Sequence, residues 1–363
     1  MSSAQETELL APAEPREVPD IVRAAPRLYV RGGGTKPWYA ASEESGVATL
    51  STRGLSAIVE YEPAEYTITA LAGTPLAELQ SELAKHGQSL PFDPPFVEAG
   101  STVGGCVATG VNGPGRVRYG GLRDFVLGVR FVDGRGREVR GGGKVVKNAA
   151  GFDLAKLMVG SCGSLGVLTE VTFKVFPVAA ASLSIALQVS DLDGGLRALE
   201  RAATCGTELA SLQLEPDRLL ARLGGRAESL ERRGERFLEA VGGGKLLAAA
   251  EDRLWRWESF AQDRVTVRVP VDRRSARGLL EGLPGEVGWR VLGAAHSVLL
   301  ELPEQLLEDV AKQLRRHDLV AQILHGAPAG RLGGGAVSEL EARVTGVLDP
   351  DARFAAPALR LLR

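Results

Sequence analysis

The stretch Arg31-Gly32-Gly33-Gly34-Thr35-Lys36 follows directly on a β-type segment, Leu28 to Val30. Three consecutive glycines let neighbouring backbone N–H groups converge on one point, which forms a concave site for an anion. Thr35 adds a hydroxyl donor and Lys36 adds a positive charge. The pattern predicts a pyrophosphate-binding loop, although an isolated glycine run serves about as often as a plain turn.

Two further glycine-rich regions follow in the same half of the chain. One is Gly100 to Gly110 (GSTVGGCVATG), where Ser101 and Thr102 can donate to phosphate oxygens. The other joins KNAAGFD (147–153) to GSCGSLGVLT (160–169), just before a β-run. Small residues let the backbone approach a flat ligand closely. A long ligand with a central pyrophosphate fits the three regions in this order, and FAD is such a ligand.

Two other nucleotide-binding motifs are absent from the sequence. No G-x-G-x-x-G lies between a strand and a helix with an acidic residue about 20 positions later, as the Rossmann motif requires. No G-x-x-x-x-G-K-[ST] phosphate loop occurs either. The three glycine-rich regions taken together are therefore the more specific signal.

Length and composition favour an ordinary globular protein. The 363 residues fit two domains, or one domain plus a substantial cap, and a formal net charge of -2 gives no basic excess for nucleic acid. No apolar run reaches the ~18 residues that span a bilayer. Three distant cysteines without a C-x-x-C pair indicate reduced thiols in the cytoplasm. We therefore expect a cytoplasmic protein that meets the inner membrane, if at all, only through partners.

Periodicity divides the chain near residue 177. Before it, short strands and helices alternate with glycine clusters. In this first part we expect strands at 28–30, 57–61, 67–70, 126–132 and 168–176, and helices at 19–25 and 75–86. After Pro177 the composition becomes rich in Leu, Ala and Arg. The expected strands there are 181–189, 264–271 and 297–302, alternating with helices at 192–203, 227–241 and 303–317. This alternation predicts a ferredoxin-like cap on one antiparallel sheet.

Several motifs together resemble a known family. They are RGGGTK (31–36), AGTPLAEL (72–79), GQSLPFDPP (87–95), GSTVGG (100–105), RDFVLG (123–128), GGKVVKNAAGFD (142–153) and GSLGVLTEVTFKV (163–175). This set is similar to the FAD-binding (E) subunit of glycolate oxidase, a flavoprotein of the vanillyl-alcohol-oxidase type with a PCMH-type FAD domain. The resemblance is continuous from about Leu10 to Pro177. In the second half it rests on Trp255 and the C-terminal stretch.

The resemblance implies an α+β fold. A two-subdomain PCMH-type FAD-binding domain would occupy residues 1–177. A ferredoxin-like α/β cap would occupy 178–363. The C-terminal segment would either stay with the cap or return to the FAD domain. Gly32 to Lys36 and Ser101 to Gly105 would hold the pyrophosphate from opposite sides, and Gly163 to Leu168 would line the adenine or isoalloxazine. The candidate cofactor-binding residues are Arg31, Gly32, Gly33, Gly34, Thr35, Lys36, Pro94, Ser101, Thr102, Val103, Gly104, Gly105, Thr109, Gly113, Asp124, Gly151, Gly163, Gly166 and Val167.

Three departures from the family pattern bear on the site. The first loop lacks the histidine that covalently flavinylated members carry, so we expect non-covalent FAD. Phe152 stands where the family usually has tyrosine, and Phe354-Ala355-Ala356-Pro357 replaces Phe-Asn-Pro-Gly.

The candidate catalytic groups give a weaker signal. Cys106 and Cys162 are interpreted as small packed residues. The four histidines are not spaced as metal pairs, so no metal is expected. His325 is the best-placed base, but a lone histidine at a strand end is more often structural. No catalytic residue is assigned.

Three functional hypotheses follow. The favoured one is an FAD-binding oxidoreductase subunit of a glycolate oxidase complex, which passes electrons from glycolate or a similar small 2-hydroxyacid towards an iron–sulfur subunit beside a catalytic flavoprotein subunit. The second is a stand-alone FAD-dependent D-lactate-type dehydrogenase, which would turn over as an isolated chain. The third is a flavin-free structural subunit, which would be colourless.

Overall fold

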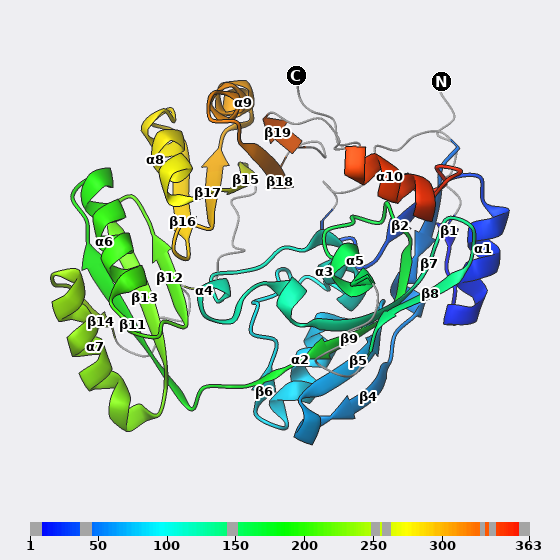
Figure 1. Ribbon diagram of the computed structural model, residues 1–363, viewed down its shortest axis with the longest axis horizontal. Helices are drawn as coiled ribbons and strands as arrows, with labels where there is room; N and C mark the ends of the chain where they lie inside the picture. The colour runs from blue at the N-terminus through cyan, green and yellow to red at the C-terminus, as the bar shows by residue number, and fades with distance from the viewer. Residues whose placement is uncertain are drawn as a thin grey trace.

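The computed structural model describes residues 9–36, 46–143, 152–247, 255, 263–326, 331–333 and 339–355. The chain forms two lobes joined by the segment that follows β10 (Figure 1). The N-terminal lobe holds three small sheets, and the other lobe holds one sheet of nine strands. The mixed α+β fold expected from the sequence is confirmed.

The first part of the N-terminal lobe is a parallel sheet in the order β1-β3-β2. Its strands are β1 (Leu9–Leu10), β3 (Ala48–Ser51) and β2 (Leu28–Arg31), and helix α1 (Val18–Ala24) packs beside them. Val18, Val22, Leu28 and Leu50 form the centre of its apolar core. This sheet fixes the direction in which β2 delivers the loop that follows it.

The second part is an antiparallel five-stranded sheet in the order β4-β5-β9-β7-β8. Its strands are β4 (Ile58–Glu62), β5 (Thr67–Leu71), β9 (Val167–Lys174), β7 (Val126–Val132) and β8 (Glu138–Gly142). Helices α2 (Leu76–Ala84), α3 (Val103–Thr109) and α5 (Leu154–Met158) cover the apolar face. The predicted stripe of Leu76, Leu79 and Leu83 is fully buried there, which confirms the amphipathic helix.

Short elements complete this lobe. They are the 3-10 turns η1 (Pro15–Glu17), η3 (Thr52–Gly54), η4 (Pro63–Glu65) and η5 (Leu122–Asp124), helix α4 (Arg116–Tyr119), and the paired strands β6 (Gln88–Ser89) and β10 (Phe176–Pro177).

The second lobe contains two units of the β-α-β-β-α-β pattern, where the sequence predicted one cap. The first unit comprises β11 (Ala181–Gln188), α6 (Leu192–Thr204), β12 (Ser211–Leu214), β13 (Arg218–Gly225), α7 (Ala227–Val241) and β14 (Lys245–Leu247). The second comprises β15 (Val265–Pro270), α8 (Arg273–Glu281), β16 (Gly288–Leu292), β17 (Ser297–Leu302), the turn η7 (Glu304–Leu306), α9 (Leu307–Arg316) and β18 (Val320–His325).

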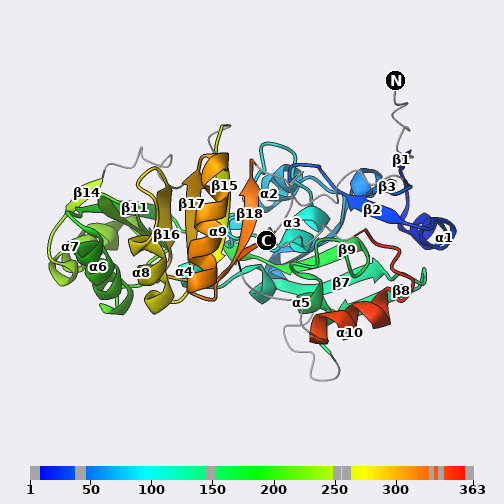
Figure 2. The ribbon, with the colours of Figure 1, turned by 90° about the horizontal axis from the view of Figure 1, so that it is seen from above.

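The two units share one antiparallel sheet because β12 pairs with β16. The strand order is β14-β11-β13-β12-β16-β17-β15-β18-β19, with β19 (Arg331–Gly333) at the edge. Within each unit the order is that of a ferredoxin-like fold. The four long helices lie on the side of the sheet away from the N-terminal lobe (Figure 2). The opposite face of the sheet is therefore turned towards the N-terminal lobe.

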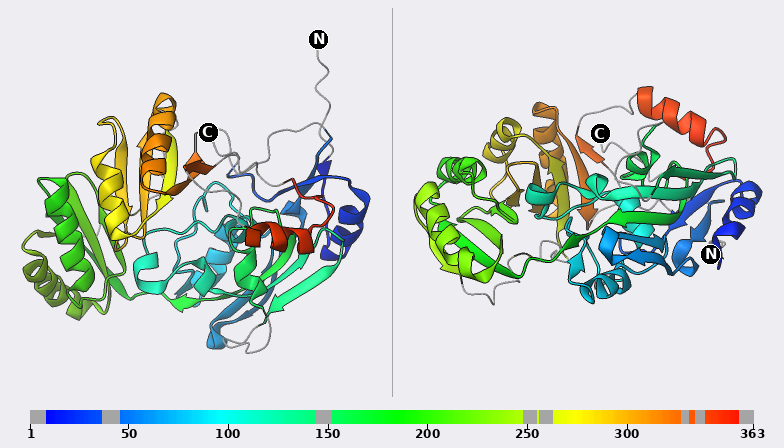
Figure 3. Two further views of the ribbon diagram at one scale, coloured as in Figure 1. Left: turned by 45° about the horizontal axis from the view of Figure 1, so that its top comes forward. Right: turned by 60° about the horizontal axis from the view of Figure 1, so that its bottom comes forward.

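The chain returns to the N-terminal lobe at its end. Helix α10 (Glu339–Leu348) lies over this lobe rather than over the cap (Figure 3). Val344 and Leu348 pack against the core of the five-stranded sheet. Phe354 then forms a parallel bridge with Leu28 on β2. Residues from opposite ends of the sequence therefore share the first subdomain.

Candidate dinucleotide-binding site

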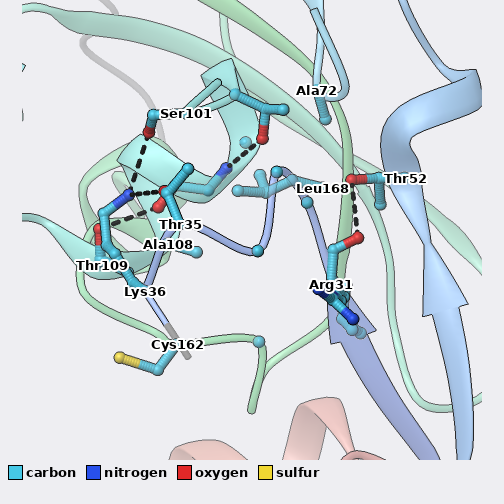
Figure 4. A pocket seen from close by; sticks show the side chains of 18 of the residues that line it. Arg31, Thr35, Lys36, Thr52, Ala72, Ser101, Ala108, Thr109, Cys162 and Leu168 are labelled. Carbon is cyan, nitrogen blue, oxygen red and sulfur yellow. Dashed lines mark hydrogen bonds between the residues drawn. The ribbon is translucent and has the colours of Figure 1, made fainter. Parts of the chain in front are cut away.

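A pocket with about 710 Å³ of empty space lies where the two subdomains of the N-terminal lobe meet (Figure 4). Its lining residues are Tyr29, Val30, Arg31, Gly32, Gly33, Gly34, Thr35, Lys36, Thr52, Ala72, Ser101, Thr102, Gly104, Gly105, Ala108, Thr109, Cys162, Gly163, Gly166 and Leu168. The pocket thus draws on all three glycine-rich regions of the sequence.

The first glycine turn packs directly on the second. A Cβ atom at Gly33 would lie 2.1 Å from the carbonyl oxygen of Gly100, and one at Gly32 would lie 2.4 Å from the Oγ1 of Thr102. Side chains at these positions would push the two turns apart. Gly34 has φ 68°, a left-handed conformation that glycine adopts without strain.

Within the described part of the chain, the amides of Gly33, Gly34 and Thr35 make no hydrogen bond to the protein. Arg53 instead fixes the turn from behind, because its Nη2 donates to the Gly33 carbonyl oxygen at 3.0 Å. An exposed row of amides on a fixed loop is the arrangement that receives an anion. The first turn is therefore ready to donate to a ligand.

The second turn begins helix α3, which the sequence did not predict. Thr102 caps the helix, because its Oγ1 accepts from the Gly105 amide at 3.3 Å. The amide of Val103 donates to Thr74, and that of Gly104 donates to Ala72 at 2.7 Å. Since these three amides are already bonded within the protein, the second turn shapes the pocket more than it supplies donors.

Lys36 is buried at the junction of the two turns. Its Nζ donates to the Oγ of Ser101 at 3.0 Å and to the Oγ1 of Thr35 at 3.2 Å, and it lies 5.5 Å from the centre of the Phe96 ring. Only 8% of the residue is exposed, and burial lowers the pKa of its amine. No carboxylate among the described residues forms an ion pair with it. A buried cation among neutral partners is stabilised when an anion binds beside it.

The far end of the pocket is formed by β2 and the turn before β9. Gly163 (φ 79°) faces Val30, and Gly166 has φ 153°, where a Cβ would lie 2.7 Å from Phe131. Tyr29 and Cys162 also line this end, and burial raises the pKa of the Tyr29 hydroxyl. Backbone and ring surfaces, rather than charges, dominate here, which suits a flat heterocycle.

The predicted binding residues fall into three groups. Those that line the pocket are Arg31, Gly32, Gly33, Gly34, Thr35, Lys36, Ser101, Thr102, Gly104, Gly105, Thr109, Gly163 and Gly166. Those placed elsewhere are Pro94, Val103, Gly113, Asp124 and Val167, of which Asp124 lines a second cavity. Gly151 lies outside the described residues, as does most of the KNAAGFD block.

Six lining residues were not predicted from the sequence as members of the site. They are Tyr29, Val30, Thr52, Ala72, Ala108 and Cys162. The alternation along β2 could have indicated Tyr29, since it lies two positions before the predicted Arg31 on the same strand. Thr52 and Ala72 depend on how strands far apart in the sequence come together, and no local signal marks them.

Two further candidate groups from the sequence are Cys106 and His325. Cys106 is fully buried, and burial raises the pKa of its thiol to about 12. His325 ends β18 in the second lobe. Within the described ranges, no group of three or more His, Cys, Asp or Glu side chains could hold a metal ion. A search of the same ranges finds no helix long and apolar enough to cross a membrane.

Comparison with known proteins identifies the class. Residues 8–142 match the family model described as FAD binding domain. The chain thus carries an FAD-binding domain and is related to FAD-linked oxidoreductases, as the motifs predicted.

Three individual relatives are subunits of glycolate oxidase or D-lactate dehydrogenases. Glycolate oxidase subunit GlcE of Escherichia coli is 46% identical over 168 residues, which cover 46% of this chain and 45% of the relative. D-lactate dehydrogenase of Archaeoglobus fulgidus is 34% identical over 180 residues, 48% of this chain and 40% of the relative. Glycolate oxidase subunit GlcD of Bacillus subtilis is 32% identical over 150 residues, 41% of this chain and 32% of the relative. Each alignment spans less than half of the curated relative.

A solved structure supports the fold. Alkyldihydroxyacetonephosphate synthase superposes with a TM-score of 0.73 at 14% identity, and the match covers 96% of this chain and 76% of that chain. At this identity the likeness shows the fold alone. It extends over both lobes, whereas the sequence matches cover about half of this chain.

Proposed function

We propose that this chain is the FAD-carrying subunit of an oxidase that acts on glycolate or a similar 2-hydroxyacid. The observation that carries the proposal is the buried Lys36 amine, which faces the pocket between two glycine turns and has no acidic partner in the described structure. The kinship with a glycolate oxidase subunit supports the substrate class.

The residues present fit a dinucleotide. The free amides of Gly33, Gly34 and Thr35 would donate to the pyrophosphate, and the Lys36 amine would neutralise part of its charge. Ser101 and Thr102 would close the pocket from the other side. When bound, FAD supplies an isoalloxazine ring that accepts a hydride and releases electrons singly. The chain itself binds and orients the cofactor and limits the access of water.

We further propose that FAD is held without a covalent bond. The turn from Gly32 to Lys36 carries no histidine. Cys106, whose thiol interacts electrostatically with Lys36, is fully buried, and burial raises its pKa to about 12, so it is held as the unreactive thiol. Acid precipitation should therefore release all of the flavin into the supernatant. Flavin that stays with the precipitated protein would contradict this part of the proposal.

The remaining assignments concern the assembly. We propose that electrons leave towards an iron–sulfur subunit, that a second flavoprotein subunit completes the oxidase, and that the complex is cytoplasmic, with any membrane contact made by partners. The names of the GlcE and GlcD relatives, both subunits of glycolate oxidase, support an assembly.

We also propose residues 1–177 and 178–363 as the two domains, with the C-terminal segment returning to the first.

The test combines colour and turnover. The purified full-length chain should show flavin absorbance, and it should oxidise glycolate only when it is co-expressed with its partner subunits. Turnover of D-lactate by the isolated chain with an artificial acceptor would instead establish the stand-alone dehydrogenase. A colourless chain that cannot be reconstituted with FAD would establish the structural subunit.

A further inference from the structure

The short turn η3 (Thr52–Gly54) contacts the first glycine turn at two points. Thr52 lines the dinucleotide pocket, and its Oγ1 lies 3.5 Å from the Arg31 carbonyl oxygen (Figure 4). The next residue, Arg53, donates from its Nη2 to the Gly33 carbonyl oxygen at 3.0 Å. A single element therefore holds both the start and the middle of the proposed pyrophosphate loop.

Close backbone packing holds η3 in place from two sides. A Cβ atom at Gly54 would lie 2.4 Å from the Pro12 carbonyl oxygen, so the segment after β1 packs directly on η3. A Cβ atom at Gly73, which follows β5, would lie 1.9 Å from the Thr52 carbonyl oxygen. The Gly73 amide also donates to the Leu55 carbonyl oxygen at 2.8 Å. Because η3 is packed between the two subdomains of the N-terminal lobe, Arg53 extends from a fixed base.

The Arg53 hydrogen bond acts on the peptide group that joins Gly33 to Gly34. In a planar trans peptide group the C=O and the N–H point in opposite directions. The C=O of this group accepts from the guanidinium, and its N–H makes no hydrogen bond within the described part of the chain. A charge-assisted hydrogen bond at one end of a peptide group polarises the other end. Arg53 should therefore make the Gly34 amide a stronger donor to an anion in the pocket.

The first turn lies among positive charges. The described residues that line the pocket include Arg31 and Lys36 but no acid. The Arg31 guanidinium packs on the turn, since a Cβ atom at Gly34 would lie 2.6 Å from its Nη2. The Arg53 side chain donates to Gly33 but does not line the pocket. An anion bound at the turn would therefore interact with Arg53 through the turn itself.

We propose that Arg53 is a positioning residue for the pyrophosphate of FAD, which acts through the Gly33 carbonyl group without touching the cofactor. The inference rests on the proposed function in one respect, because it requires FAD to bind at this turn. It does not depend on the substrate of the oxidase. It goes beyond the proposed function by assigning part of the affinity for the dinucleotide to a charge outside the pocket lining.

The test measures the affinity of the flavin-free full-length chain for FAD and for riboflavin, which lacks the pyrophosphate. Arg53→Met removes both the donor and the charge. This variant should lower the FAD affinity by about 3- to 10-fold and leave the riboflavin affinity nearly unchanged. The expected loss is smaller than for a buried cation, because the exposed guanidinium is partly screened by solvent.

Two further variants separate the charge of Arg53 from its packing. Arg53→Lys keeps the charge and should restore most of the FAD affinity at low salt. Arg53→Gln keeps a neutral donor and should remain close to Arg53→Met. The difference between the Lys and Gln variants should shrink at about 1 M salt, where charges are screened over ~3 Å.

Arg23 provides a matched control in the same lobe. Its Nη1 donates to the carbonyl oxygen of Gly136 at 2.6 Å, which is the same kind of contact at a glycine outside the pocket lining. Arg23→Met should therefore leave the affinities for both flavins unchanged. Urea unfolding shows whether each variant is folded and how much stability it has lost.

Several outcomes would overturn the role of Arg53. They are an unchanged FAD affinity in Arg53→Met, equal losses for FAD and riboflavin, equal FAD affinities of the Lys and Gln variants at low salt, and an equal loss of FAD affinity in Arg23→Met.

Failure of the proposed function gives a different result. A co-expressed oxidase that binds FAD but does not oxidise glycolate would overturn the proposed function, while the FAD and riboflavin affinities would still decide the role of Arg53. A chain that binds neither flavin would overturn both.

Discussion

The backbone amide of Leu28 donates to the carbonyl oxygen of Arg353 at 2.7 Å, although 325 residues separate them in the sequence. The Ala355 amide donates back to the Leu28 carbonyl oxygen at 2.8 Å. Leu28 begins β2, the strand that leads into the glycine turn at 32–34. The end of the chain therefore supports the strand that positions the proposed pyrophosphate loop.

The first prediction concerns Asp349, which orders this segment. Its buried carboxylate accepts the amides of Arg353 and Phe354, each at 2.9 Å. Asp349→Ala leaves two amides without a partner and should destabilise the protein by about 1–3 kcal/mol. Because the released segment pairs with β2, flavin retention should fall as well. Urea unfolding and the flavin-to-protein ratio measure the two effects, and Asp351→Ala, at an exposed position, serves as the control.

The second prediction concerns Gly33. A Cβ at this position would meet the Gly100 carbonyl oxygen at 2.1 Å, so Gly33→Ala must separate the two turns. We expect most of the flavin to be lost during gel filtration. Gly285→Ala is the matched control, because nothing lies within 4 Å of a Cβ there. Full flavin content in Gly33→Ala would show that the contact between the turns is not required.

The third prediction concerns Asp93, whose Oδ2 accepts the Gly115 amide at 2.6 Å. Burial raises the pKa of this carboxyl to about 6 from an ordinary value of 3.8. Its folded pKa is above the unfolded value, so its contribution is fully present below pH 3.8 and is lost as the pH rises through 6. Asp93→Asn keeps an acceptor for Gly115 without the charge.

This variant should gain about 1–3 kcal/mol of stability over the wild type at pH 7.5 and little at pH 4. Urea unfolding at several pH values between these limits gives the comparison. Parallel pH profiles for the two proteins would show that the carboxyl does not titrate in this window.

The fourth prediction concerns the thiols. Burial raises the pKa of Cys106 to about 12, whereas Cys162 and Cys205 are partly exposed. A thiol reagent at pH 8 should therefore label Cys162 and Cys205 in the native protein, and Cys106 only after unfolding. Bound FAD should slow the labelling of Cys162, which lines the pocket. Rapid modification of Cys106 in the native state would contradict the packing described for α3.

Much of the fold could be predicted because the decisive patterns are local. Strand β7 (Val126–Val132) and helix α7 (Ala227–Val241) agree with the expected ranges to the residue. Helix α3 could not be predicted in the same way. Its sequence VGGCVAT has poor helix propensity, and it is helical because Thr102 caps it and Gly104 packs on Ala72.

For the site too, residues that are neighbours in the sequence could be predicted, whereas contacts between distant segments could not. The glycine turn at 32–34 and the cation at Lys36 could be predicted, because these residues are neighbours in the sequence. The sequence indicates small residues at 100–105 but not that their amides bond to Thr74 and Ala72. The second cavity, which Asp124 lines, could not be predicted from the sequence, because its lining residues come from both lobes and include Arg116 and Arg268.

Whether the Lys36 amine and the glycine turn bind a pyrophosphate is tested by the affinity of the flavin-free chain for FAD and for riboflavin, in the wild type and in Lys36→Met. Riboflavin has the ring but no pyrophosphate. We expect the wild type to prefer FAD strongly and Lys36→Met to lower the FAD affinity by about 10- to 100-fold, the value of a charge-assisted hydrogen bond, with riboflavin affinity unchanged. Equal affinity for the two flavins in the wild type, or an unaltered FAD affinity in Lys36→Met, would contradict it.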